Sequence, residues 1–185
     1  VQPIYYLYDN SYVRDSLTRY PGKFAAIGLV DRHAEDAPQK LETLVTRDGF
    51  SGLRIHLSRP DDPSEWAAPD QLPIWRKAEE LGASFLIFGP AEKLPAVEPI
   101  VARFPEVKVA LDHIGGAPTD EEPPEPLLNN VLRMAQYPNV YVKFSAQPQK
   151  SKQEFPFRDT FPTFKRIYDA FGPHRLLWGT NFPHV

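Results

Sequence analysis

Arg54 and His56 end the apolar segment 52–57, where they could bind a small acidic molecule. Side chains alternate along a β-strand, so these two are expected to share one face that points inward, while their apolar neighbours take the other. The planar guanidinium group of arginine can donate two parallel hydrogen bonds to a carboxylate. We therefore predict that Arg54 and His56 bind substrate. A structural arginine paired with a buried acid is an equal alternative for Arg54.

His113 is the sharpest single candidate, because it ends another apolar segment and precedes a Gly-Gly pair. A histidine at the end of a strand can ligate a metal or shuttle protons. The alternative is a core histidine whose hydrogen bonds are satisfied. Strand alternation places His113 on the same face as Leu111 and turns Asp112 away. Asp112 is accordingly expected to be a structural acceptor behind the site.

Lys143 and Ser145 lie two residues apart at the end of the segment 141–145, so they are expected to share a face. A lysine inside the molecule could bind an anion or polarise a carbonyl group. Its side chain could equally extend to the rim and reach water. We predict a substrate-binding role for Lys143.

Asn181 and His184 come at the end of the last apolar segment. Gly179 shares a face with Asn181 and leaves room beside it. Asn181 occupies a position where a general base would be useful, and we predict that it is catalytic. An amide cannot accept a proton at neutral pH, but it can orient a water molecule. His184 is predicted to bind substrate at the mouth of the site, whereas His33 is expected in a solvated loop.

Short apolar segments that alternate with helix-period segments are expected to position these residues. This alternation is typical of βαβ units and a parallel sheet. Strands are expected at 24–30, 52–57, 84–88, 107–111, 140–144 and 175–178, with the remnant of a seventh at 1–5. Helices are expected at 11–20, 34–48, 70–81, 93–104, 126–136 and 160–171. The long connections follow strands, which favours a barrel with one functional mouth at the carboxyl ends of the strands.

The composition is that of a globular protein with a buried core, and we expect a single domain over residues 1–185. Hydrophobic residues make up 42% of the chain and charged residues 24%. The net charge of −3 gives no reason to expect nucleic acid or a membrane as a partner. The chain has no cysteine, which excludes thiolate nucleophiles and disulfides. No apolar run approaches the roughly 20 residues of a membrane helix. We expect a cytoplasmic protein with a small-molecule substrate.

Several motifs together resemble one known family. They are Leu-Asp-His-Ile-Gly-Gly at 111–116, Asn-Val-Tyr-Val-Lys-Phe-Ser at 139–145 and Arg-Leu-Leu-Trp-Gly-Thr-Asn-Phe-Pro-His at 175–184, with Gly-Leu-Arg at 52–54 and Tyr-Pro-Gly-Lys-Phe at 20–24. In their order and spacing they resemble the amidohydrolase-related lactonases of the amidohydrolase superfamily. That group includes sugar lactonases and 2-pyrone-4,6-dicarboxylate lactonases.

The resemblance implies a TIM-type (β/α)8 barrel, a fold of about 250 residues. The family's first strand has a His-x-His pair, which this sequence lacks. The chain would therefore hold strands two to eight, with strand one missing and both ends truncated. An incomplete barrel exposes strand edges, so self-association through those edges is expected.

The resemblance also implies a hydrolase that acts on a lactone, or a similar cyclic ester of a small acid, by attack of water. His113 matches the family's strand-six histidine, and Arg54 matches a region that handles acidic groups of the substrate. Asn181 stands in place of the strand-eight aspartate that activates water, so the hydrolytic activity of this chain would be impaired.

A divalent ion, zinc or manganese, is common in the superfamily, although the lactonase branch resembles enzymes that work without one. His113 would be the candidate ligand here. Without the histidine pair, and with an amide at 181, a tight metal site is not expected. Two other functions stay open. One is a metal-dependent decarboxylase of the same superfamily, and the other is a non-catalytic, ligand-binding or truncated barrel.

Overall fold

Six parallel strands form a single sheet in the computed structural model, which describes residues 1–57, 65, 68–119 and 125–182. Their order in the sheet follows the chain. The strands are β1 (Ile27–Gly28), β2 (Gly52–His56), β3 (Ser84–Phe88), β4 (Val109–Leu111), β5 (Val140–Phe144) and β6 (Leu176–Trp178). A parallel sheet whose neighbours are consecutive in sequence fits the TIM-type barrel that the motifs imply.

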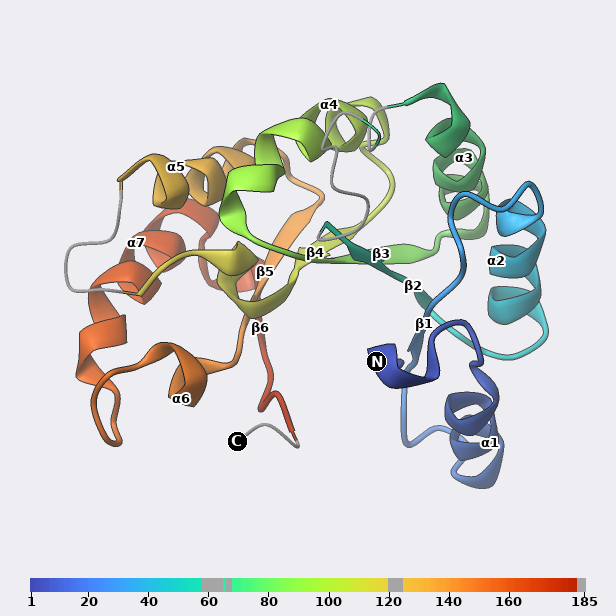
Figure 1. Ribbon diagram of the computed structural model, residues 1–185, viewed down its shortest axis with the longest axis horizontal. Coiled ribbons are helices and arrows are strands. Elements are labelled where there is room, and N and C mark those ends of the chain that lie inside the picture. Colours follow the sequence, from blue (N-terminus) through green and yellow to red (C-terminus); the bar gives the residue numbers. More distant parts are fainter. Residues whose placement is uncertain (58–64, 66–67, 120–124, 183–185) are drawn as a thin grey trace.

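Helices cover the outer side of the curved sheet. Figure 1 shows α2, α3, α4, α5 and α7 around the outside of the strands, and the N-terminus near β1 on the open side. The helices are α1 (Ser11–Arg19), α2 (Ala37–Thr46), α3 (Leu72–Leu81), α4 (Leu94–Arg103), α5 (Glu125–Arg133), α6 (Gln147–Lys150) and α7 (Phe161–Phe171). None of the helices in the described part of the chain is long and apolar enough to cross a membrane.

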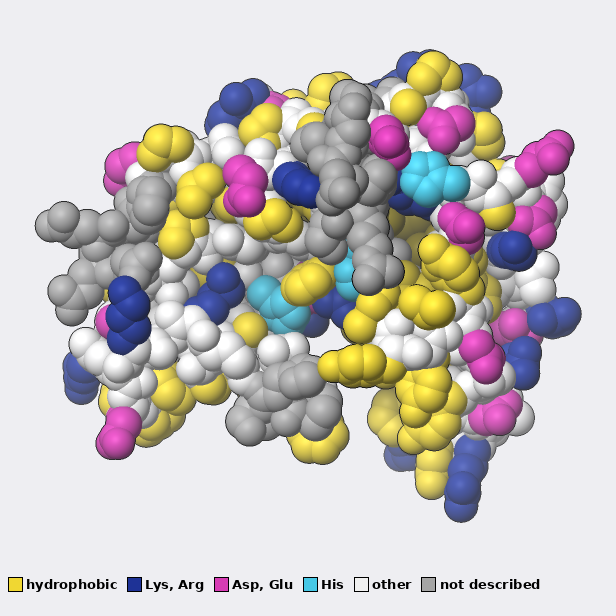
Figure 2. Space-filling view, viewed as in Figure 1, with side chains coloured by type: hydrophobic (Ala, Val, Ile, Leu, Met, Phe, Trp, Pro, Cys, Tyr) yellow, Lys and Arg dark blue, Asp and Glu magenta, His cyan; other side chains and the backbone are white. Residues whose placement is uncertain are grey.

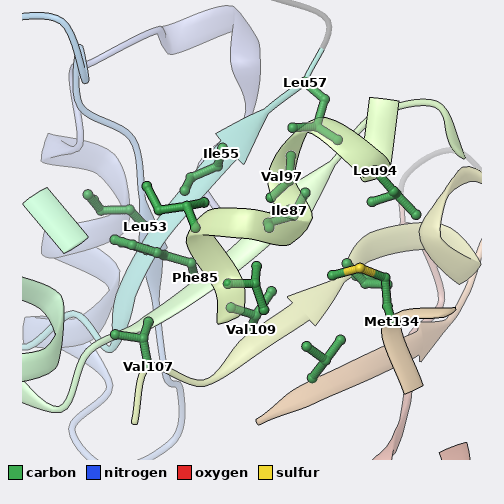
Figure 3. Packing of buried hydrophobic residues seen from close by; sticks show 14 of the residues in the cluster. Leu53, Ile55, Leu57, Phe85, Ile87, Leu94, Val97, Val107, Val109 and Met134 are labelled. Atoms are coloured by element: carbon green, nitrogen blue, oxygen red, sulfur yellow. The ribbon is translucent and has the colours of Figure 1, made fainter. Parts of the chain in front are cut away.

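The core lies between the sheet and these helices. Leu53, Ile55 and Leu57 are buried, and they point toward the same core as Ile87 and Val97 (Figure 3). Burial of this apolar surface is the main stabilising contribution to such a layer. The prediction that polar and apolar side chains of β2 lie on opposite faces is confirmed, because the polar residues take the face opposite the core.

Gly52 is required where β2 begins beside β3. A Cβ atom at this position would lie 1.8 Å from the backbone oxygen of Ser84, closer than any real contact. The close approach fixes the register in which Arg54 pairs with Leu86 and His56 with Phe88. A glycine at the start of β2 therefore helps to place two of the predicted site residues.

The N-terminal part of the predicted fold needs two corrections. Residues 1–5 do not form a strand: Ile4–Tyr6 is a 3-10 helix, and the backbone N–H of Gln2 donates one hydrogen bond to the oxygen of Ile27, at 2.8 Å. The expected strand 24–30 is reduced to Ile27–Gly28. The side chain of Asn10 explains this, because its amide bonds both the N–H and the oxygen of Leu29, at 2.9 and 2.8 Å. The described part of the chain thus has six strands and not seven.

β6 is an edge strand of the sheet. Within the described residues β6 pairs only with β5, and Trp178 at its end is 80% exposed. An edge strand with an exposed aromatic side chain can pair with another chain. We expect a chain of residues 1–185 to form oligomers or aggregates in sedimentation velocity experiments, and Trp178→Lys to reduce them. A single monomeric species that unfolds cooperatively would contradict this expectation.

Candidate active site

A buried carboxylate, Asp112, lies at the centre of the predicted site. Its side chain is only 1% exposed. One oxygen is 2.6 Å from Nζ of Lys143, and the other is 2.7 Å from Nη2 of Arg54. Buried charges are stable only when they are paired, and this pairing joins β2 to β5 across the end of β4. Asp112 is therefore a structural acceptor, as predicted, but it lies among the predicted site residues and not behind them.

His113 reaches the same cluster through an unusual backbone turn. β4 ends at Leu111, and His113 and Ile114 then adopt left-handed conformations with φ of 49° and 54°. This turn brings Nε2 of His113 to 3.6 Å from Asp112 and Nδ1 to 2.9 Å from Oγ of Ser145. The predicted alternation failed here because the extended conformation on which it depends stops before His113. The following Gly-Gly pair is the sequence signal for such a turn.

Phe88 is part of the cluster, although the sequence did not single it out. The guanidinium carbon of Arg54 lies 4.5 Å from the centre of its ring. The rings of His56 and His113 meet it edge-on, with centroids at 5.2 and 5.4 Å. Phe88 is the register partner of His56 on β3, so both side chains point to the same side of the sheet. The pairing of β2 with β3, once known, would have indicated it.

The electrostatic balance of the cluster is positive. Burial lowers the pKa of the Arg54 guanidinium, although the neighbouring Asp112 opposes this. The pKa of His113 is also lowered, first by burial, then by the charges of Lys143 and Arg54, with Asp112 acting in the opposite direction. His113 is consequently neutral at pH 7. Two cations facing one carboxylate leave a net positive charge, which suits an anionic ligand.

Lys143 points into the cluster and not to the rim. Its side chain is 20% exposed and its Nζ atom bonds Asp112. A Cβ atom on Gly179 would lie 3.1 Å from Cε of this lysine, so the glycine leaves the space that Lys143 occupies. Toward the middle of the face in Figure 2, histidine and cationic side chains lie together in a hollow between hydrophobic ones.

The remaining predicted residues stand apart from this cluster. Asn181 is half-buried with a left-handed φ of 65°, and none of the contacts described for the chain joins its side chain to Asp112 or His113. His184 lies outside the described residues. His33 is largely solvated, as predicted, with Nδ1 3.6 Å from a carboxylate oxygen of Asp70. The structure thus brings Arg54, His56, His113 and Lys143 together and leaves Asn181 unconnected to them.

Comparison with known proteins identifies the family. The family model described as amidohydrolase matches residues 1–185. The chain belongs to the amidohydrolase family. It is 26% identical over 181 residues to L-fucono-1,5-lactonase of Burkholderia ambifaria, and this match covers 95% of the chain and 60% of that enzyme. It is also 26% identical over 186 residues to 2-pyrone-4,6-dicarboxylate hydrolase of Comamonas testosteroni, covering 95% of the chain and 59% of that enzyme.

Solved structures show the same fold. A probable 2-pyrone-4,6-dicarboxylic acid hydrolase from Acinetobacter baumannii, crystallised with citric acid, superposes with a TM-score of 0.83 at 20% identity. That match covers 100% of this chain and 67% of the other. An amidohydrolase from Burkholderia multivorans with bound zinc gives a TM-score of 0.77 at 20% identity, covering 95% and 64%. The chain spans about 60% of the length of the curated lactone hydrolases it matches.

The described residues of this amidohydrolase chain do not fit a metal ion. Both oxygens of Asp112 are bonded to cationic groups, Lys143 and Arg54, which would repel a divalent ion. No three His, Cys, Asp or Glu side chains in the described ranges are grouped as a metal would require. No step of the chemistry below is therefore assigned to a metal.

The pKa of His113 can be measured directly. NMR titration of its imidazole should give a pKa below the ordinary 6.5, and the Asp112→Asn variant should lower it further, because Asp112 raises it. The unfolded state then binds more protons than the folded state between the two pKa values, so this group makes the chain less stable as the pH falls through about 6.5. The urea-unfolded chain is the control, and a folded-state pKa at or above 6.5 would contradict the described environment.

Proposed function

We propose that the protein hydrolyses a lactone of a small acid, with water attacking the ring carbonyl at the carboxyl ends of the strands. One observation supports this most strongly: Asp112 holds two cationic side chains beside a neutral histidine. Lactone hydrolases that are 26% identical to this chain support this reaction class. The activity of the whole protein is part of this proposal.

Arg54 and Lys143 are proposed to bind and polarise the substrate. An ammonium group has three N–H donors, and the described contacts of Lys143 use one of them for Asp112. The other donors can bind the carbonyl oxygen of a lactone, where negative charge develops as water attacks. Arg54, fixed by Asp112 and stacked on Phe88, can bind an acidic group of the same substrate.

His113 is proposed to donate a second hydrogen bond to the carbonyl oxygen. In a neutral imidazole one nitrogen donates and the other accepts. We assign the proton to Nε2, so that Nδ1 accepts from the hydroxyl of Ser145 at 2.9 Å. The distance of 3.6 Å from Nε2 to Asp112 is too long for a good hydrogen bond, so this N–H is available to a substrate.

Asn181 is proposed to orient the attacking water without accepting its proton. Hydrolysis adds the water oxygen to the carbonyl carbon, breaks the ring C–O bond and moves one proton from the water to the released alkoxide. Asp112 is bonded to two cationic side chains and is poorly placed to take that proton. The amide of Asn181 has no proton-accepting form at neutral pH. We therefore propose a slow enzyme whose rate is limited by the lack of a general base.

The replacement Asn181→Asp tests this proposal. Aspartate tolerates the left-handed backbone at this position as asparagine does, so the fold should be retained. In the intact protein, kcat with sugar-acid lactones and 2-pyrone-4,6-dicarboxylate should rise by about 100-fold or more, the usual contribution of a positioned general base. Asn181→Ala is the matched control, because it removes the amide without adding a carboxylate.

Two results would count against the hydrolase. One is an absence of turnover with every lactone in both the parent protein and Asn181→Asp. The other is an equal rate for Asn181→Asp and Asn181→Ala, which would remove the residue from the reaction. Binding of a lactone without hydrolysis would instead favour a non-catalytic, ligand-binding barrel.

A further inference from the structure

The segments that follow β4 and β5 are joined at two points. The first segment carries His113, and the second contains Ser145 and the short helix α6. The hydrogen bond of 2.9 Å between His113 and Ser145 joins them beside the proposed site of reaction. Lys150, the last residue of α6, joins them again farther along both segments. His113 therefore stands at one end of a stretch of chain that is fixed at both ends.

Lys150 makes the second connection with both its side chain and its backbone. Its Nζ atom donates to the backbone oxygen of Ala117 at 2.8 Å, and its own backbone oxygen accepts from the hydroxyl of Thr119 at 2.6 Å. Ala117 is fully buried, so removal of the ammonium group would take this donor from a buried oxygen. A buried acceptor without a partner is unfavourable. The ammonium group therefore stabilises the position of Ala117.

The backbone between His113 and Ala117 is strained. Residues 113–116 all have positive φ, although His113 and Ile114 are not glycines. Left-handed backbone is costly for residues with a Cβ atom, and more so for a β-branched residue such as Ile114. Such a conformation persists only where surrounding contacts hold it. The bond from Lys150 is one of these contacts, because Ala117 directly follows the turn.

The charge of Lys150 also acts on the imidazole of His113. Burial is the main cause that lowers the pKa of His113, and Asp112 opposes it. The charges of Lys143, Arg54 and Lys150, in decreasing order, lower this pKa further. Burial lowers the pKa of Lys150 itself. As long as it is protonated, Lys150 favours the neutral imidazole that the proposed reaction uses.

We infer that Lys150 is a positioning residue, whose bond to Ala117 holds the turn that presents the imidazole of His113 to the substrate. The inference rests on the proposed hydrolysis and adds a residue that takes part without touching the lactone. The described hydrogen bonds of its side chain and its carbonyl group join it to Ala117 and Thr119, and not to the Asp112 cluster. Its contribution is to fix the direction of the N–H group of His113, which must point at the carbonyl oxygen as charge develops there.

Replacement of Lys150 in the intact protein tests this inference. Lys150→Met removes the donor and the charge but keeps a long side chain. With a sugar-acid lactone, kcat should fall about 10- to 100-fold, the cost of a misplaced catalytic group, while KM should change by less than about twofold. NMR titration should show a raised pKa of His113, because a positive charge is lost, and the acid limb of the kcat profile should move to higher pH. Lys150→Arg keeps the charge and the donors, so it should retain most of the kcat of the parent.

Thr163→Val is the matched control, because Thr163 also bonds this stretch, at the backbone oxygen of Pro118, but carries no charge. It should lower the free energy of unfolding and leave kcat and the pKa of His113 close to those of the parent. Lys150→Gln keeps the test informative if Lys150→Met does not fold. It retains N–H donors and removes the charge, so it should still raise the pKa of His113.

An unchanged pKa of His113 in whichever of Lys150→Met and Lys150→Gln folds would overturn the inference. An unchanged kcat in Lys150→Met, or an equal fall of kcat in Thr163→Val, would also overturn it. A raised pKa of His113 in the Lys150 variants, without lactone turnover by the parent, would reject the hydrolase but keep the positioning of the imidazole. Lactone turnover that does not depend on Lys150 would do the reverse.

Discussion

The burial of one carboxylate, Asp112, is the constraint on which the rest of the site depends. An ionised carboxylate removed from water is costly unless cations and hydrogen bonds compensate for it. Arg54 from β2 and Lys143 from β5 provide that compensation at 2.7 and 2.6 Å. Two cationic side chains from strands that are not neighbours are thereby held near one point. The residual positive charge, next to a neutral His113, supports the proposal that the cluster binds an acidic substrate.

The same arrangement supports the proposed attack of water on an ester carbonyl. Both oxygens of the carboxylate face cationic groups, so it acts as an anchor for donors of hydrogen bonds. Donors aimed at a carbonyl oxygen stabilise the charge that develops when water attacks it. We have proposed that these donors polarise the carbonyl group of a lactone and that the amide of Asn181 orients the attacking water.

Much of the fold could be predicted, because buried parallel strands are short apolar runs that a sequence shows directly. The inward face shared by Arg54 and His56 followed from strand alternation and was correct. The same rule was wrong at Asp112 and His113, where four consecutive residues with positive φ, 113–116, end the extended backbone. Strand alternation also did not predict that β1 is short. That shortening depends on two hydrogen bonds between the side chain of Asn10 and the backbone of Leu29, which are 19 residues apart in sequence. Contacts that depend on the pairing of distant strands, such as the one between Phe88 and Arg54, have no local signal.

A double-mutant cycle between Asp112→Asn and Lys143→Gln tests the central role of the buried carboxylate most directly. The free energy of unfolding would be measured in urea for the parent, both single variants and the double variant, with the exposed pair Lys165 and Asp169 as the control cycle. We predict a coupling energy of about 1.5 kcal/mol or more for the buried pair, as for a hydrogen bond between charged groups, and close to zero for the control. A coupling energy for Asp112 and Lys143 no larger than that of the exposed pair would contradict this account.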